Sequence, residues 1–145
     1  MLNLPKFNQV AFAFATTLAP DPAPGDPFEF VCPQNMILSP ISVNLHFTAS
    51  AAAANRYIGL TITTNIFPVF TFASPFPIVA GQTFSVTAST SPISVATPTP
   101  SFTLHIPFPP NVFLYNPDRF AIYAFGMDAA DQISFIYFHH KFWPI

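Results

Sequence analysis

Hydrophobic and polar residues alternate with a period of two along much of this chain. In residues 41–48 every odd position is apolar and every even position is polar, and residues 10–14 alternate large apolar residues with alanine. A period of two is typical of β-strands that bury one face. The runs with this pattern or with a strand-like composition are residues 10–14, 41–48, 58–63, 69–72, 84–88, 102–106, 112–115, 120–125 and 133–142. They predict about eight to ten strands and no helix.

The segments between these runs contain proline, asparagine and serine rather than glycine. The chain has 18 Pro but only 4 Gly, so we expect long connections and no tight Asn-Gly hairpins. Residues 51–55, AAAAN, are too few for an independent helix and are predicted to be a connection. The fold class predicted is all-β, with a single compact sandwich or short barrel of jelly-roll or β-tulip type.

Proline also suggests how the chain is divided. Residues 17–27 contain four prolines, which favour an extended and semi-rigid conformation. We therefore expect an N-terminal arm and Pro-rich spacer at residues 1–27 and a β body at residues 28–145. On this interpretation residues 1–16 reach away from the body.

Charge is scarce. Charged residues make up 7% of the chain, against roughly a quarter in ordinary globular proteins, and residues 57–117 contain no Asp, Glu, Lys or Arg. Exposed apolar surface usually marks an interaction site, so much of the outer surface is expected to be covered by other copies or by a larger partner. Four Lys and Arg residues and a net charge of −2 give no basic surface for nucleic acid, which is excluded as a partner.

The high apolar content, 51% of residues, raises the question of a membrane span. A spanning helix needs about 18 or more consecutive apolar residues. Residues 66–80 come nearest, but Pro68, Pro75 and Pro77 would break a helix there. No membrane partner is expected. Cys32 is the only cysteine, which excludes an internal disulfide, and is predicted to be a small buried apolar residue.

Catalytic and metal-binding patterns are weak. The acidic residues are interpreted as solvated loop residues: Asp21, Asp26, Glu29, Asp118, Asp128 and Asp131. His139 and His140 are adjacent, so in a strand they point to opposite faces and do not share a metal. A cross-strand metal site that includes His46 or His105 stays open as an alternative, as does Cys32 paired with a histidine. The prediction is a protein that is not an enzyme and holds no cofactor or metal.

The aromatic residues give a stronger signal. The chain has 19 Phe but only one Trp and four Tyr, which favours core packing and buried interfaces over sugar binding. A two-layer core of this length does not easily bury every ring, and several lie in the arm or in Pro-rich connections. The predicted interface residues are Phe7, Phe12, Phe14, Phe28, Phe76, Phe108 and Trp143.

Two stretches resemble small all-β virion proteins of tailed bacteriophages. They are NRYIGLTI and IPFPPNVFLYNPDRFAIYAFGMDAADQISFIYFHHKFW. In that group an apolar Pro-containing strand precedes a turn and a strand, and an Asp-containing turn leads to a final strand that ends near Trp. The matching landmarks in this chain are Pro109, Pro110, residues 116–119, Asp131, Ile133, Ile136 and Trp143. The resemblance covers roughly the C-terminal half.

The resemblance implies a capsid decoration or cement protein on the outer surface of a virion. Proteins of that group commonly form trimers, bind the major capsid protein and send terminal arms across neighbouring subunits. The alternative is a carbohydrate-binding or other ligand-binding β-module on a fibre or surface, against which the shortage of Trp, Asp and Asn clusters counts. An enzyme would need a convergent polar pocket, which these residues do not suggest.

Overall fold

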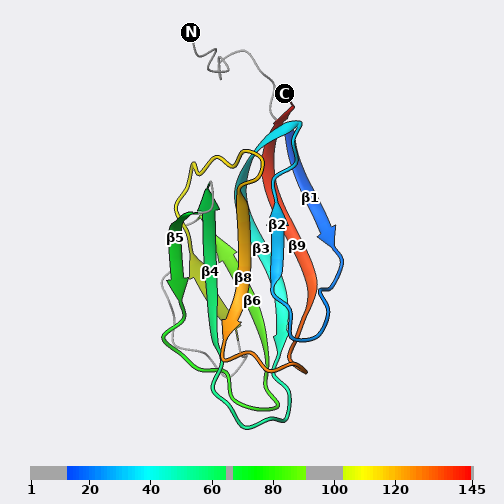
Figure 1. Cartoon of the computed structure of the whole chain (residues 1–145), viewed down its shortest axis with the longest axis vertical. Helices are drawn as coiled ribbons and strands as arrows, with labels where there is room; N and C mark the ends of the chain where they lie inside the picture. Colours follow the sequence, from blue (N-terminus) through cyan, green and yellow to red (C-terminus); the bar gives the residue numbers. More distant parts are fainter. Residues whose placement is uncertain (1–12, 65–66, 91–102, 145) are drawn as a thin grey trace.

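The chain folds into two β-sheets that pack face to face (Figure 1). The structure is a computed structural model that describes residues 13–64, 67–90 and 103–144. No described residue is helical, and this part of the chain accordingly contains no helix that could cross a membrane. The prediction of an all-β sandwich is confirmed. Its nine strands are β1 (Ala13–Ala19), β2 (Phe28–Val31), β3 (Met36–Thr48), β4 (Tyr57–Thr64), β5 (Phe67–Ala73), β6 (Thr83–Ser89), β7 (Thr103–Pro107), β8 (Arg119–Phe125) and β9 (Gln132–Pro144).

The strand order is that of a jelly roll. One sheet has the order β1-β9-β3-β6-β7 and the other β2-β8-β4-β5. The antiparallel pairs are nested: β4 pairs with β5, β3 with β6, β2 with β8 and β1 with β9. A long hairpin that curls into two facing sheets produces this nesting. Strand β7 is an addition, and it extends the larger sheet by pairing in parallel with β6.

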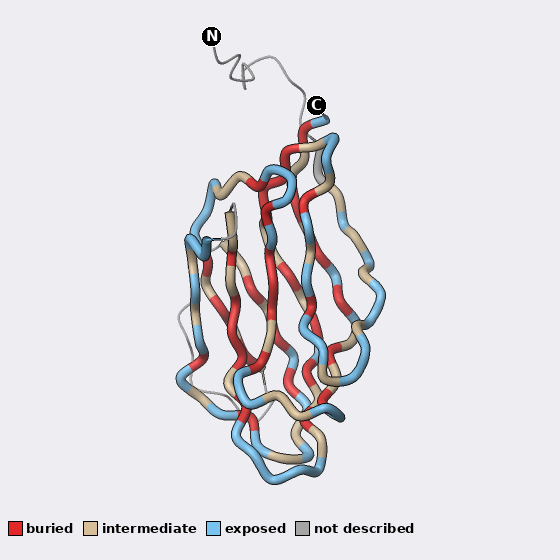
Figure 2. The backbone as a smooth tube through the Cα atoms, viewed as in Figure 1, coloured by how far each residue is buried: buried red, intermediate tan, exposed pale blue. Residues whose placement is uncertain are grey.

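The alternating sequence explains which side of each strand is buried. Strand β3 places Val43, Leu45 and Phe47 at 2% exposure or less, with the polar residues between them facing outward. Rings from both sheets meet in the centre, where the ring centroid of Phe138 lies 4.8 Å from that of Phe30 and 5.4 Å from that of Phe120. Figure 2 shows the buried positions on the strands and the exposed ones in the connecting loops.

Several strand assignments differ from the sequence analysis. Strand β1 extends to Ala19, although residues 17–19 were predicted to belong to the Pro-rich spacer, and β3 begins at Met36 and not at residue 41. Residues 28–31 form β2, which the alternation does not reveal because the strand has only four residues and follows a Pro-rich stretch. Residues 112–115 were expected to form a strand but contribute only an isolated bridge between Leu38 and Leu114. Pro109 and Pro110 before this segment lack the N–H groups that a longer ladder would require.

The described part of the N-terminal arm is attached to the body. Strand β1 pairs along its whole length with β9, beside which it lies in Figure 1. After β1, the backbone N of Gly25 donates to the carbonyl of Asp131 at 2.8 Å, and Gln132 Nε2 donates to the carbonyl of Pro22 at 2.9 Å. The Pro-rich segment therefore lies against the sandwich. Residues 1–12 lie outside the described residues.

Candidate interaction surfaces

Two of the predicted interface phenylalanines, Phe28 and Phe108, lie inside the protein. Phe28 and Phe108 are each 4% exposed and belong to the core. The ring of Phe108 packs edge-on against Phe120, with 5.4 Å between centroids. Both residues follow Pro-rich sequence, but their rings are part of the hydrophobic core. Little of their surface is therefore accessible to a partner.

The other candidates have mixed positions. Trp143 is 9% exposed and packs against Phe113, with 5.5 Å between ring centroids. Phe76 is half-buried in the connection after β5. Phe14 lies in β1 opposite Lys141, while Phe7 and Phe12 lie outside the described residues. The large apolar side chains that the structure exposes are different ones: Leu18, Val31, Phe67, Val69, Val79, Tyr115, Phe125, Phe135 and Tyr137.

The outer face of the four-stranded sheet, here called the small-residue face, is defined by Glu29, Val31, Gly59, Thr61, Thr63, Val69, Thr71, Ala73, Arg119, Ala121, Tyr123 and Phe125. Its middle row runs across the strands from Glu29 through Ala121 and Thr61 to Thr71. One exposed ion pair lies on it, between Arg119 Nη1 and Glu29 Oε1 at 3.0 Å. Small residues in the middle leave this face without large projections.

Gly59 lets the ring of Tyr123 lie close over the sheet. A Cβ atom at Gly59 would lie 2.7 Å from Cζ of Tyr123, so the tyrosine ring covers the glycine directly. The ring also packs edge-on against Phe125, with 4.9 Å between centroids. Burial raises the pKa of the Tyr123 hydroxyl, which is therefore neutral at physiological pH.

The edges of the four-stranded sheet are not shaped for strand addition. Strand β2 has four residues and carries Glu29, while β5 contains Pro68 and a register shift opposite Ile62 and Thr63. Short strands, charges, proline and bulges all discourage pairing with another chain. Association through the faces is therefore favoured over association through these edges.

The outer face of the five-stranded sheet, here called the polar face, is defined by Thr16, Leu18, Ser42, Asn44, His46, Ser85, Thr87, Ser89, Thr103, His105, Phe135, Tyr137, His139 and Lys141. One row runs from Leu18 through Tyr137, Asn44 and Thr87 to His105. Thr87 Oγ1 donates to Asn44 Oδ1 at 3.0 Å. Hydroxyl, amide and imidazole groups dominate this face.

Phe135 interrupts the regular pairing of β9. The register between β3 and β9 shifts from Asn44 opposite Tyr137 to His46 opposite Ser134, so β9 bulges here. Phe135 has a φ of 52°, which is rare for a bulky residue. Its backbone N donates to Asp21 Oδ1 at 3.0 Å, and its side chain is 63% exposed. The bulge turns an aromatic ring outward onto the polar face.

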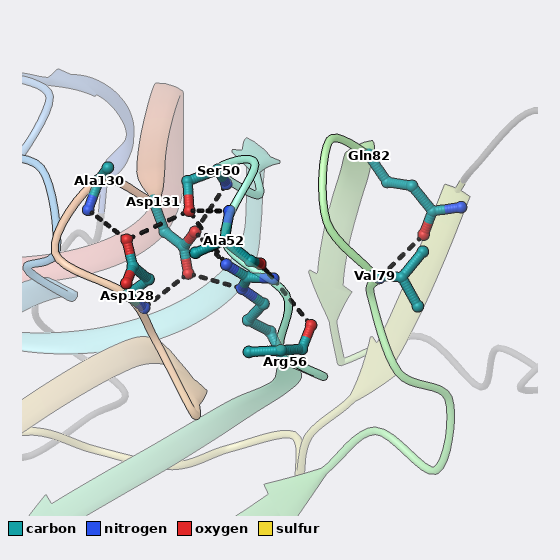
Figure 3. A network of polar contacts seen from close by, with 9 residues as sticks. Ser50, Ala52, Arg56, Val79, Gln82, Asp128, Ala130 and Asp131 are labelled. Carbon is teal, nitrogen blue, oxygen red and sulfur yellow. Dashed lines mark hydrogen bonds and ion pairs between the residues drawn. The ribbon is translucent and has the colours of Figure 1, made fainter.

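A buried ion pair links two connecting loops at one end of the sandwich (Figure 3). Arg56 and Asp131 are both fully buried, with Nε of Arg56 2.9 Å from Oδ2 of Asp131. All five N–H groups of the guanidinium have acceptors: both carboxylate oxygens of Asp131, the hydroxyl of Ser50 and the carbonyls of Ala52 and Ala54. This network joins the β3–β4 connection to the β8–β9 turn.

The network also determines the protonation of Asp131. Burial alone would raise the pKa of this carboxyl, but hydrogen bonds from Arg56 and from the backbone N–H groups of Ser50 and Asp128 outweigh it and lower the pKa. Asp118 is also buried and accepts a hydrogen bond from the backbone N of Tyr115. The prediction of solvated acidic residues is wrong for Asp118 and Asp131. The pair could have been predicted from the position of Arg56, which is the only charged residue between Glu29 and Asp118. A single charge next to an apolar strand needs a partner of opposite charge.

The histidines and Cys32 do not form a reactive cluster. Cys32 is fully buried, as predicted, and burial together with the charge of Asp118 raises the pKa of its thiol. His140 is buried against the rings of Phe30, Phe138 and Phe142, whereas His139 lies on the polar face beside Thr16. Within residues 13–64, 67–90 and 103–144, no three His, Cys, Asp or Glu side chains are grouped so that they could hold a metal ion.

Two sequence comparisons give no relative. Neither a scan of protein-family models nor a search of curated protein sequences finds a match to this chain. The likeness to bacteriophage virion proteins therefore rests on the two sequence stretches alone. Membership of that group stays a prediction.

Proposed function

We propose that this chain is a non-enzymatic structural protein of a virus particle, a capsid decoration protein that binds the major capsid protein on the outer surface of the shell. The observation that carries the proposal is the small-residue face. Its net charge is zero, because its two charged residues, Glu29 and Arg119, form an ion pair with each other, and it is bordered by apolar side chains, of which Val31, Val69 and Phe125 are 41%, 57% and 47% exposed. Phe67, the first residue of the edge strand β5, is 67% exposed at the border of the same sheet.

Charge is as scarce at the described surface as it is in the sequence. Of the nine charged residues that the structure describes, three are buried: Arg56, Asp118 and Asp131. A free protein needs surface charge to remain soluble and separate from its neighbours. A protein that is covered on one side by a partner does not need charge on that side.

The mechanism would be passive. Burial of apolar surface contributes about 25 cal/mol per Å², and a protein that binds only the assembled shell stabilises it by mass action. Many copies would each add a small contribution. A homotrimer, as in the phage proteins that the chain resembles, is proposed as the form that binds.

Co-sedimentation tests this proposal. Lysate from cells that produce the chain is fractionated by sedimentation, and mass spectrometry follows the chain and the particles. We expect the chain to sediment with virion-sized particles. A double variant, Phe67→Ser with Val69→Ser, should lose this association, while Leu18→Ser, equally exposed at 66% on the other sheet, should keep it.

Two results would contradict the proposal. One is a wild-type chain that stays with small soluble proteins. The other is a chain that binds particles equally well in all three forms, which would place the contact elsewhere. Binding should also change little between low and high salt, because few charges lie on the small-residue face.

A further inference from the structure

The polar face contains a shallow groove between β3, β6 and β9. It encloses about 390 Å³ and is lined by Asn44, Leu45, His46, Ser85, Val86, Thr87, Phe135 and Tyr137. This volume is within the range of sites for small ligands, about 300 to 1,000 Å³. The groove lies on the opposite side of the sandwich from the small-residue face, so a ligand there would not compete with a partner bound at that face.

Two aromatic rings make one side of the groove apolar. Phe135 is 63% exposed and Tyr137 is 44% exposed. The imidazole of His46 packs edge-on against Phe135, with 5.3 Å between ring centroids, and supports that ring from the side. Rings held in this way can stack against a ligand that has an apolar face.

The remaining side of the groove offers neutral hydrogen-bonding groups. The hydrogen bond from Thr87 to Asn44 uses the amide oxygen and leaves the amide nitrogen of Asn44 as a donor. Ser85 and His46 lie side by side on paired positions of β6 and β3. The lining contains no Asp, Glu, Lys or Arg, so it matches a ligand without formal charge.

The backbone at Phe135 provides an independent observation. A φ of 52° is unfavourable for a bulky residue, and glycine would adopt it without strain. The surrounding contacts hold this conformation, with Asp21 accepting the hydrogen bond from the backbone N. Strained residues of this kind cluster at binding and catalytic sites. An exposed ring at a strained position therefore indicates a role for the ring itself.

We propose that this groove binds a neutral saccharide. Sugar rings combine an apolar face of C–H groups with hydroxyls at the edge, which matches two aromatic rings beside amide, hydroxyl and imidazole groups. Phe135 and Tyr137 would stack against the sugar, and Asn44, Ser85 and His46 would hydrogen-bond its hydroxyls. This inference does not depend on particle binding, and it applies to the purified chain.

The test uses the purified full-length chain on an array of neutral oligosaccharides built from glucose, galactose, mannose and N-acetylglucosamine, followed by titration calorimetry with the best binder. Phe135→Gly removes the ring and relieves the backbone strain. Its unfolding temperature should stay the same or rise, while its affinity falls by about tenfold or more. Tyr137→Ala should weaken binding to a similar degree. Phe67→Ala is the matched control, with a ring of similar exposure on the other sheet, and it should bind like wild type.

Three results would overturn the proposal. The first is a chain that binds none of the neutral oligosaccharides. The second is binding that Phe135→Gly and Tyr137→Ala leave unchanged. The third is a wild-type protein whose oligomer dissociates in Phe135→Gly, as measured by light scattering, because this face would then be covered by another copy of the chain.

Discussion

The two outer faces of the sandwich differ in chemistry, although each carries only one or two charged residues: Glu29 and Arg119 on the small-residue face and Lys141 on the polar face. The small-residue face has glycine, alanine and threonine in its middle and apolar side chains at its border. The polar face has rows of serine, threonine, asparagine and histidine and two outward aromatic rings. The inward positions of both sheets follow the same rule, since most of them are apolar, with His140 as an exception. The alternation of apolar and polar residues therefore determines the fold. The residues at the outward positions give its two faces different surfaces.

The largest loss of stability is expected when the buried ion pair between Arg56 and Asp131 is broken. This pair lies on neither outer face. Asp131→Asn leaves Arg56 buried without its charge partner, and breaking such a pair costs about 3 to 5 kcal/mol of unfolding free energy. Urea denaturation should show this loss, and both faces should lose their binding together. A variant that keeps one binding function at full strength while it is largely unfolded would contradict the common dependence of the faces on this network.

A substitution at Gly59 should cause a smaller loss of stability and should change only the small-residue face. Gly59→Ala forces the Tyr123 ring away from the sheet and should cost about 1 kcal/mol, at the low end for overpacking because the ring is half-exposed and can move. Particle binding should weaken, while saccharide binding on the polar face stays unchanged. The double variant with Tyr123→Ala removes the clash, so denaturation should show that it recovers part of the lost stability.

Acid should lower the stability of the protein through His140, which lies in the five-stranded sheet. Burial lowers the pKa of His140, which lies in β9 among aromatic rings, and nearby His139 lowers it further. The unfolded chain takes up a proton near pH 6.5, but the folded chain does so only at lower pH. The free energy of unfolding should therefore fall as the pH drops below about 6.5 and level off below the lowered pKa. Denaturation curves between pH 7.5 and 4.5 measure this slope.

A variant separates His140 from the other histidines. His140→Phe removes the titrating group but keeps a ring in the aromatic cluster. Its free energy of unfolding should vary less between pH 7.5 and 4.5 than that of wild type. An unchanged slope would assign the pH dependence to other groups.

The smallest effect is expected from the exposed ion pair. Arg119→Gln or Glu29→Gln should cost about 0.2 to 1 kcal/mol, because exposed pairs gain little and salt screens them. The loss should disappear in high salt. Urea denaturation at low and high salt measures this loss of unfolding free energy. A loss as large as that of Asp131→Asn would mean that the pair between Arg119 and Glu29 is not exposed to solvent in the native protein.

The sequence predicts the fold well where the alternation is long. Strands β4, β6, β8 and β9 match the predicted runs to within two residues at each end, and β3 contains the predicted run 41–48 but begins earlier, at Met36. The four residues of β2 carry too short a pattern. Residues 112–115 carry the composition of a strand but pair with β3 only through the bridge between Leu114 and Leu38. Pairing with a segment far along the chain is not visible in a local pattern.

The surfaces were less predictable than the fold. Phe28 and Phe108 were expected at an interface because they lie near prolines, but burial depends on which segment closes over the core. The groove joins residues of β3, β6 and β9 that are far apart in sequence, so no local motif marks it. The bulge at Phe135 could not be inferred from alternation, because it is a departure from that pattern.

The nested pairing has a consequence for how the chain is made. Strand β8 lies between β2 and β4, and β9 lies between β1 and β3, so the last two strands occupy central positions in both sheets. Neither sheet can be completed until residues 119–144 have left the ribosome. Until then the earlier apolar strands lack their partners, and folding that depends on such distant pairings is slow and prone to aggregation. Molecular chaperones are therefore expected to hold the nascent chain during its synthesis.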